Sequence, residues 1–156
     1  IRKSKNSKIG ESFKLGNFST ISTFPSSSFV IENGVDVRNY CSFYVGENAT
    51  LILHSRVFMN NYCSINALEK IEIGENTLFG EGVRIYDHNH EYTGEKVETR
   101  KFKTAPVKIG KDCWLGSNVV VLKGVTIGDN CIIGAGCLVY KDVPAGSVVK
   151  QNQPFS

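Results

Sequence analysis

An aliphatic or small residue returns every six positions between Ile109 and Ala145, and this period constrains the fold more than any other feature of the sequence. The residue four places after each of these is small or β-branched, from Cys113 to Val149. Neither an α-helix, with a period of about 3.6, nor an ordinary strand, with a period of about 2, produces this spacing. A short fixed repeat punctuated by Gly and Asn or Asp predicts a β-solenoid. The seven first-position residues are Ile109, Leu115, Val121, Ile127, Ile133, Val139 and Ala145.

Each six-residue unit is expected to form a short strand and a corner. The first and fourth-following residues point inward, and Gly with Asp, Asn or Glu supplies a turn that tolerates left-handed backbone angles. Three units make one triangular coil of 18 residues. Ile109 should therefore lie under Ile127, and Cys113 under Cys131, at the strand spacing of roughly 4.8 Å.

The repeat extends towards the N-terminus with insertions, which we expect at the corners of the coils. It begins at Ile9 and is interrupted at Ser26–Ser28, and about four extra residues lie near Glu69. After the interruption, the inward positions are predicted at Ile31, Val37, Phe43, Val45, Leu51, Val57, Cys63, Ile73, Phe79 and Ile85. The pattern then breaks for a polar, charged stretch, which predicts one protruding loop at about 88–106, the kind of excursion that carries function on rigid scaffolds. The expected organisation is a basic lead-in at 1–8, the solenoid at 9–150 and a tail at 151–156.

Composition bounds the class of protein. The chain has 156 residues, 41% of them hydrophobic, which fits one globular domain with a sizeable core. The apolar runs are too short to span a membrane, and the first eight residues lack a signal-peptide core. A net charge of +3 is compatible with a polyanionic ligand or simply with a mildly basic surface; the basic loop residues Arg100, Lys101 and Lys103 are open to the same two interpretations. We expect no nucleic-acid partner.

The five cysteines are predicted to be small core residues. Cys41, Cys113, Cys131 and Cys137 fall at fourth-following positions, and Cys63 falls at a first position. Their spacing matches neither a metal site nor a C-x-x-C pair. Free buried thiols indicate a reducing compartment, so we expect a cytoplasmic protein.

The units Ile-Gly-Lys-Asp-Cys-Trp, Ile-Gly-Asp-Asn-Cys-Ile and Ile-Gly-Ala-Gly-Cys-Leu resemble those of the hexapeptide-repeat acyltransferases. The resemblance covers about residues 29–150. It implies an all-β fold, a left-handed parallel β-helix, whose handedness departs from the usual right-handed crossover. Handedness is thus implied by the resemblance, whereas the solenoid follows from the spacing.

Two of the three histidines lie at the mouth of the expected loop. A neutral imidazole beside a groove is a suitable general base near pH 7, but a surface histidine without a role is an equal alternative on sequence alone. The resemblance to sugar O-acetyltransferases of the galactoside, maltose and capsule type implies that His90 is catalytic. His88 stands where those relatives usually have a small residue. Asp87, His88 or Glu91 are candidates to orient the imidazole, as is a backbone carbonyl.

Other positions match the family one at a time. Trp114, expected at an exposed corner, matches a tryptophan that lines the acceptor and thioester pocket, and Asn60 matches an active-site asparagine. Positions that line the cofactor channel or its nucleotide end are matched by Ser117, Ala135, Tyr140 and Lys141. Ser117 and Ala135 can equally be simple turn residues, and Tyr140 stands where relatives often have Thr.

The resemblance implies acetyl-CoA as co-substrate, no metal, and direct transfer of acetyl to a hydroxyl of a sugar or of a capsular or surface polysaccharide. Alternatives within the same fold are an N-acetyltransferase for an amino-sugar nucleotide and a drug-inactivating acetyltransferase. A scaffold with a vestigial site is the non-enzymatic alternative. A zinc hydratase with three histidine ligands is disfavoured, because His54 and His88 occupy corresponding places in units that lie on different faces.

Counting units predicts a homotrimer. His90 leaves the prism at the edge after the third face, whereas Asn60 lies on the second face and Trp114 on one of its borders. These three residues therefore cannot converge within one chain. Head-to-tail packing around a threefold axis brings His90 of one chain to Asn60 and Trp114 of the next, in agreement with the trimers known in the family.

Overall fold

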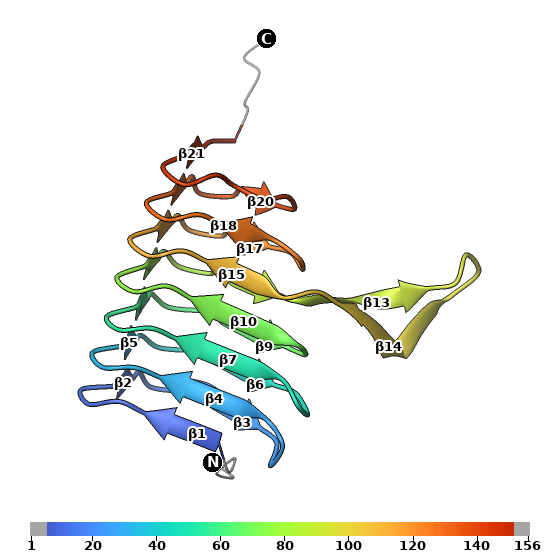
Figure 1. The fold of residues 1–156 in the computed structure, drawn as a ribbon, viewed down its shortest axis with the longest axis horizontal. Helices are drawn as coiled ribbons and strands as arrows, with labels where there is room; N and C mark the ends of the chain where they lie inside the picture. Colours follow the sequence, from blue (N-terminus) through green and yellow to red (C-terminus); the bar gives the residue numbers. More distant parts are fainter. Residues whose placement is uncertain (1–5, 152–156) are drawn as a thin grey trace.

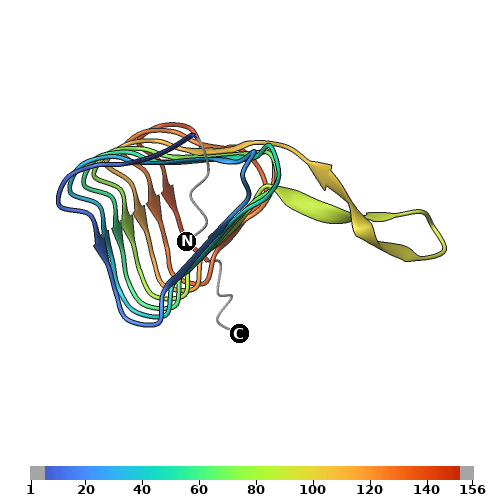
Figure 2. The same cartoon turned by 90° about the horizontal axis from the view of Figure 1, so that it is seen from below.

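The computed structural model describes residues 6–151, and its fold is the left-handed parallel β-helix that the repeat and the resemblance predict (Figure 1). Three parallel sheets form the faces of a triangular prism, and Figure 2 shows this triangle from one end. We number them sheets 1, 2 and 3 in chain order and name each edge by the two sheets that it joins. The described residues contain no helix long and apolar enough to cross a membrane.

The strands of each sheet follow one another up the prism. Sheet 1 consists of β1 (Asn6–Ile9), β4 (Ser28–Ile31), β7 (Thr50–Leu53), β10 (Lys70–Ile73), β15 (Val107–Ile109) and β18 (Thr126–Ile127). Sheet 2 consists of β2 (Lys14–Leu15), β5 (Asp36–Val37), β8 (Phe58–Met59), β11 (Leu78–Phe79), β16 (Trp114–Leu115), β19 (Ile132–Ile133) and β21 (Val148–Val149). Sheet 3 consists of β3 (Thr20–Thr23), β6 (Ser42–Val45), β9 (Ser64–Ala67), β12 (Arg84–Tyr86), β17 (Val120–Val121) and β20 (Leu138–Val139).

The six-residue repeat is confirmed from Ile109 to Val139 but not at Ala145, which is exposed. The last coil is two residues short, so Val143 and not Ala145 lies above Ile127. Ile109 pairs with Ile127, as the 18-residue coil requires, and both are buried. The glycine that follows the strand is explained by the close stacking of the coils: a Cβ on Gly116 would lie 2.6 Å from the Ala135 nitrogen. A side chain at that point would push two coils apart, so the repeat uses glycine there.

The N-terminal coils are longer than the 18 residues that three repeat units predict. Strand partners are 22 residues apart in the register Ile31↔Leu53 and 20 apart in Leu53↔Ile73. The extra residues lie at edge 3–1, between a sheet 3 strand and the next sheet 1 strand, which confirms that the insertions are at corners. A second assignment was also wrong. Cys63 occupies the fourth-following position of the unit that begins at Met59, because the extra residues after Phe43 shift the repeat by four places and not by two.

One continuous core fills the prism from Phe29 to Val143. All five cysteines are free and buried in it, so their predicted placement as core residues is confirmed. Burial raises the pKa of the Cys113 thiol, and a thiol held in its neutral form is a poor nucleophile. Because all five are buried, the cysteines act as small apolar residues that fit beneath the corners.

Most corners contain one residue in the left-handed backbone conformation. At edge 2–3 this column runs Phe18, Tyr40, Tyr62, Gly82, Asn118 and Gly136, with φ from 58° to 72°. Gly and Asn adopt this conformation readily, whereas an ordinary L-residue incurs a cost of roughly 1–2 kcal/mol. Phe18, Tyr40 and Tyr62 form an exposed stack, which we call the aromatic ladder. Stacking worth about 0.5–1.5 kcal/mol for each pair offsets part of that cost.

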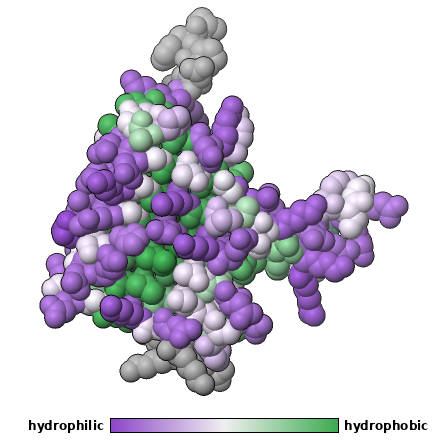
Figure 3. All heavy atoms as spheres, viewed as in Figure 1, coloured by the Kyte–Doolittle hydropathy of each residue, from purple (hydrophilic) through white to green (hydrophobic). Residues whose placement is uncertain are grey.

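The predicted loop is a β-hairpin that leaves the prism at edge 3–1. It consists of the antiparallel strands β13 (His88–Tyr92) and β14 (Val97–Thr104). It extends well beyond the coils in both views (Figures 1 and 2). Its length is largely hydrophilic, with apolar residues near its root (Figure 3).

The solenoid begins earlier than expected, because β1 starts at Asn6 and pairs with β4. Three residues of the expected lead-in thus belong to the first coil. The remainder of the lead-in, 1–5, and the tail residues 152–156 lie outside the described part of the chain.

Candidate functional site

His90 lies on β13, and its ring is held by the hairpin itself. Its Nδ1 is 3.1 Å from the Glu98 carbonyl oxygen, and its ring packs against Phe102 at a centroid distance of 4.7 Å. A carbonyl oxygen only accepts, so this contact requires the proton on Nδ1 and leaves Nε2 unprotonated in the neutral ring. His90 is exposed. The residue therefore presents a basic nitrogen at an accessible surface.

An irregularity in the hairpin creates this arrangement. The strand register jumps from His90↔Phe102 to Glu91↔Glu98, so residues 99–101 have no partner in the ladder. Figure 1 shows β14 bent part of the way along. Bulges of this kind re-aim side chains and are frequent beside active sites. Here the jump brings the Glu98 carbonyl beside the His90 ring.

His88 is largely buried, whereas His90 is exposed. Its side chain is only 17% exposed, its ring meets Tyr86 and Phe102 edge to face, and its Nδ1 lies 3.1 Å from Asp87 Oδ1. Asp87 thus contacts His88 and not His90. No hydrogen bond joins Glu91 to His90 among the described residues. Of the proposed orienting groups, the backbone carbonyl holds His90.

Asp87 also anchors the root of the hairpin. Its carboxylate is fully buried and accepts the backbone N–H groups of Leu68 and Glu69, with oxygen–nitrogen distances of 2.7–3.1 Å. Its own carbonyl accepts the Ala105 N–H at 2.9 Å. These bonds tie both ends of the hairpin to the coil below. The sequence suggested Asp87 only as a candidate to orient the imidazole of His90.

Three other predicted residues lie on a different edge. Asn60, Ser117 and Ala135 follow β8, β16 and β19 and are aligned along edge 2–3. In the lower coils, the backbone N–H groups of this edge are bound by asparagine side chains: Asn17 by Asn39, and Asn39 by Asn61. The Asn61 N–H is bound by Asn60 Oδ1 at 2.9 Å.

One coil above Asn60, side chains no longer accept the backbone N–H groups of this edge. Within residues 6–151, the N–H groups of Glu81, Ser117 and Ala135 have no hydrogen-bond acceptor. Exposed edge N–H groups that the protein leaves unbonded are ready donors to a ligand. Edge 2–3 therefore offers a row of backbone donors in its upper half and a row of asparagines in its lower half.

Trp114 lies within β16, on the flat outer face of sheet 2, and not at the corner where it was expected. It is 53% exposed and forms part of an apolar column with its strand neighbours. These neighbours were not predicted as site residues. Each of them directly precedes an inward residue, which indicates an outward-facing side chain. The column consists of Leu78, Trp114, Ile132 and Val148.

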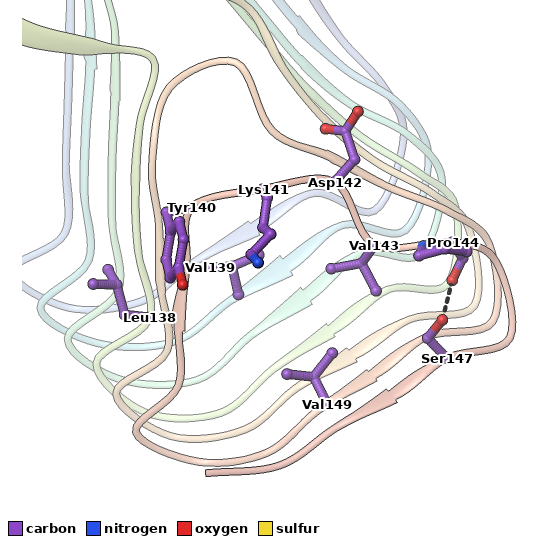
Figure 4. A pocket seen from close by; sticks show the side chains of 9 residues that line it. All are labelled: Leu138, Val139, Tyr140, Lys141, Asp142, Val143, Pro144, Ser147 and Val149. Atoms are coloured by element: carbon purple, nitrogen blue, oxygen red, sulfur yellow. Dashed lines mark hydrogen bonds between the residues drawn. The ribbon is translucent and has the colours of Figure 1, made fainter. Parts of the chain in front are cut away.

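Tyr140 and Lys141 line a pocket of about 340 Å³ at the C-terminal end of the prism. Val139, Val143 and Val149 point towards the middle of the last coil, and the Lys141 ammonium lies near the Tyr140 ring (Figure 4). The volume of this pocket is at the lower end of the range for pockets that bind small molecules. The pocket combines an apolar floor with one free cation.

The predicted residues thus fall into two groups within one chain. The histidines and the Tyr140–Lys141 pair lie at edge 3–1, whereas Asn60, Ser117 and Ala135 lie at edge 2–3. Trp114 lies on the sheet adjoining the second group. His54 is remote from both histidines, because it lies at edge 1–2 between Glu32 and Glu72. No group of three or more His, Cys, Asp or Glu side chains in the described residues is arranged to hold a metal.

Comparisons with known proteins agree with the fold and the repeat. The family described as bacterial transferase hexapeptide (six repeats) matches residues 106–141. Nodulation protein L of Rhizobium meliloti (strain 1021) is 39% identical over 110 residues, which cover 70% of this chain and 58% of that protein. The chain therefore spans little more than half the length of this relative.

Two further likenesses are more extensive. WbbJ of Escherichia coli (strain K12), assigned as a lipopolysaccharide biosynthesis O-acetyl transferase, is 30% identical over 136 residues, which cover 72% of this chain and 69% of that protein. A mutant of AntD, an N-acyltransferase from Bacillus cereus solved with dTDP and coenzyme A, superposes with a TM-score of 0.78 at 16% identity. That superposition covers 91% of this chain and 77% of AntD, and at this identity it supports the fold alone. With the confirmed repeat and the extent of the match to WbbJ, the chain belongs to the hexapeptide-repeat family of bacterial transferases.

Proposed function

We propose that this protein is an acetyl-CoA-dependent O-acetyltransferase that transfers acetyl to a hydroxyl of a sugar or polysaccharide, with His90 as general base. The observation that carries the proposal is the state of His90: Nδ1 is bound to a backbone carbonyl, and the ring is exposed. Relatedness to an O-acetyl transferase assigned to lipopolysaccharide biosynthesis supports the hydroxyl acceptor. The reaction would take place in the cytoplasm, where the five buried thiols stay reduced.

The transfer needs no covalent enzyme intermediate. Nε2 of His90 takes the proton from the acceptor hydroxyl while its oxygen attacks the thioester carbonyl carbon. The carbon–sulfur bond then breaks, and the imidazolium returns the proton to the sulfur of coenzyme A. A positioned base of this kind contributes about 10²–10⁴-fold. Held by the Glu98 carbonyl, the ring keeps the tautomer that this step requires.

The cofactor is proposed to lie along edge 2–3. The unbonded N–H groups of Ser117 and Ala135 are donors for the carbonyl groups of the pantetheine arm and for the oxyanion at the thioester carbon. Trp114 borders this edge and would cover the thioester. Tyr140 and Lys141 lie at edge 3–1 beside the C-terminal pocket, so they are proposed to contact the nucleotide end from the neighbouring chain, the one that also supplies His90.

The complete site is proposed to form between chains of a homotrimer. Rotation about a threefold axis parallel to the prism keeps every coil at its own height. The hairpin leaves between β12 and β15, and at that height sheet 2 presents Leu78 and Trp114, its two apolar residues on β11 and β16. Contact between a protruding arm and an exposed apolar column would bury both. It would also bring His90 of one chain to Asn60 and Trp114 of the next.

The test is turnover of acetyl-CoA with a panel of glycans, nucleotide sugars, amino sugars and antibiotics. We expect a sugar hydroxyl to be acetylated, giving a hydroxylamine-labile ester, whereas a stable amide would show an N-acetyltransferase instead. His90→Ala should lower turnover by about 10²–10⁴-fold and keep acetyl-CoA binding. His88→Ala, the matched control on the same hairpin, should retain most activity, and the reverse result would overturn the assignment.

Subunit sharing has its own test. Inactive His90→Ala and Asn60→Ala proteins are mixed under conditions in which subunits exchange. Mixed trimers contain some interfaces with both halves intact, so part of the activity should return. An active monomer, or proven exchange without recovery, would refute the shared site.

A further inference from the structure

The aromatic ladder ends in an open ring face. Phe18, Tyr40 and Tyr62 stack with centroids 5.1 and 5.2 Å apart and planes within 9° of parallel. Tyr40 is therefore covered on both faces. The next residue of the column is Gly82, which has no ring, so the upper face of Tyr62 has no fourth ring above it.

The groups around this face are polar. Glu81 Oε1 accepts a hydrogen bond from Asn61 Nδ2 at 3.2 Å, and these two residues directly precede Gly82 and Tyr62 in the chain. Asn118 continues the column above Gly82, and its Oδ1 would lie 2.6 Å from a Cβ placed on that glycine. The space left by the absent fourth ring is thus bordered by the Tyr62 ring below, the Asn118 amide above and the Glu81 carboxylate at the side.

A pyranose ring matches these walls. One of its faces carries C–H groups that pack on an aromatic ring, and its rim carries hydroxyls that bond to amide and carboxylate groups. The carboxylate of Glu81 makes the place unfavourable for a phosphate group. The chemistry therefore favours a neutral sugar over the nucleotide end of the cofactor.

The position of this site along edge 2–3 agrees with a role in binding the acceptor. It lies above Asn60 and below Ser117, whose N–H is free. We propose that Tyr62, with Glu81 and Asn118, binds one pyranose ring of the acceptor in the position of the missing fourth rung. That the ring belongs to the acceptor rests on the proposed function.

Binding is measured by saturation-transfer difference NMR, which needs no turnover, with the methyl glycosides of glucose, galactose, mannose and N-acetylglucosamine. At least one should receive saturation from the wild-type protein. Tyr62→Ala should weaken its binding about tenfold, as expected for the loss of an aromatic stacking partner. Gly82→Tyr should abolish binding by adding the fourth ring, since Tyr40 and Tyr62 already show that tyrosine is accepted in this backbone conformation.

One control is matched to these variants. Phe18→Ala removes a ring of the same ladder at its far end. It should bind the glycoside as the wild type does, with thermal melts confirming that all three variants fold. Saturation of no glycoside, or equal binding by Tyr62→Ala and wild type, would overturn the subsite. Intact saturation without acetylation of any glycoside would contradict the proposed function and leave the subsite standing.

Discussion

Asp87 offers the sharpest test of how the hairpin is held. Asp87→Ala removes the acceptor of two backbone N–H groups, those of Leu68 and Glu69, at a carboxylate with no exposed surface. A hydrogen bond to a charged acceptor is worth about 1.5–3 kcal/mol, so the loss of these bonds should lower the free energy of unfolding by about 4 kcal/mol. For a chain of this size each kcal/mol corresponds to roughly 2–4 °C, so the melting temperature should fall by about 8–16 °C.

Urea unfolding followed by circular dichroism measures this change. Asp129→Ala is the matched control, because Asp129 Oδ1 also accepts a backbone N–H, that of Lys111 at 3.0 Å, but at a corner that water reaches. That variant should lose less than about 1 kcal/mol. A loss below about 1 kcal/mol for Asp87→Ala, or equal losses for both variants, would refute the role of Asp87 as the buried anchor.

Three further predictions concern the thiols, a histidine and the tryptophan. The five cysteines should be slow to react with a bulky thiol reagent until the protein unfolds, and rapid labelling of three or more in the native state would contradict their inward placement. Burial works against the charged form of His54, but its hydrogen bonds to Glu72 and Glu32 outweigh this and raise its pKa above the ordinary 6.5. The stability that charged His54 contributes to the folded state is therefore fully present below pH 6.5. It is lost as the pH rises through the higher folded-state pKa, so the melting temperature should fall by about 2 °C between pH 6 and 8. Trp114→Ala should weaken self-association in sedimentation experiments and lower activity, with the core unaffected because the side chain is exposed.

The predictions for His54 and Trp114 have controls. His54→Gln should flatten the pH dependence, and an unchanged slope in that variant would assign the effect to other groups. Ile132→Ala, in the same apolar column but one coil higher, should weaken association with a smaller effect on activity. If Trp114→Ala leaves both association and turnover as in the wild type, the proposed interface is wrong.

The repeat by itself predicted a solenoid of stacked coils, and the family resemblance supplied its handedness. From Ile109 to Val139 an inward residue at every sixth position forces flat strands and tight corners, because only that geometry buries all of these side chains. The cysteines could be placed in the core for the same reason. The approximate site of the excursion also followed, since a strict period makes any break in it visible.

Only the tertiary structure decided where the irregular parts fall. The register after Phe43 was assigned two residues short, because inward and outward positions both carry apolar residues there and only strand pairing distinguishes them. The role of Asp87 depends on N–H groups 18 and 19 residues away in the chain, which no local pattern reveals. The tautomer of His90 depends on a jump in strand register, and the open face of Tyr62 depends on a glycine in the coil above. Local spacing fixes which residues point inward, whereas pairing between distant segments fixes what each exposed residue meets.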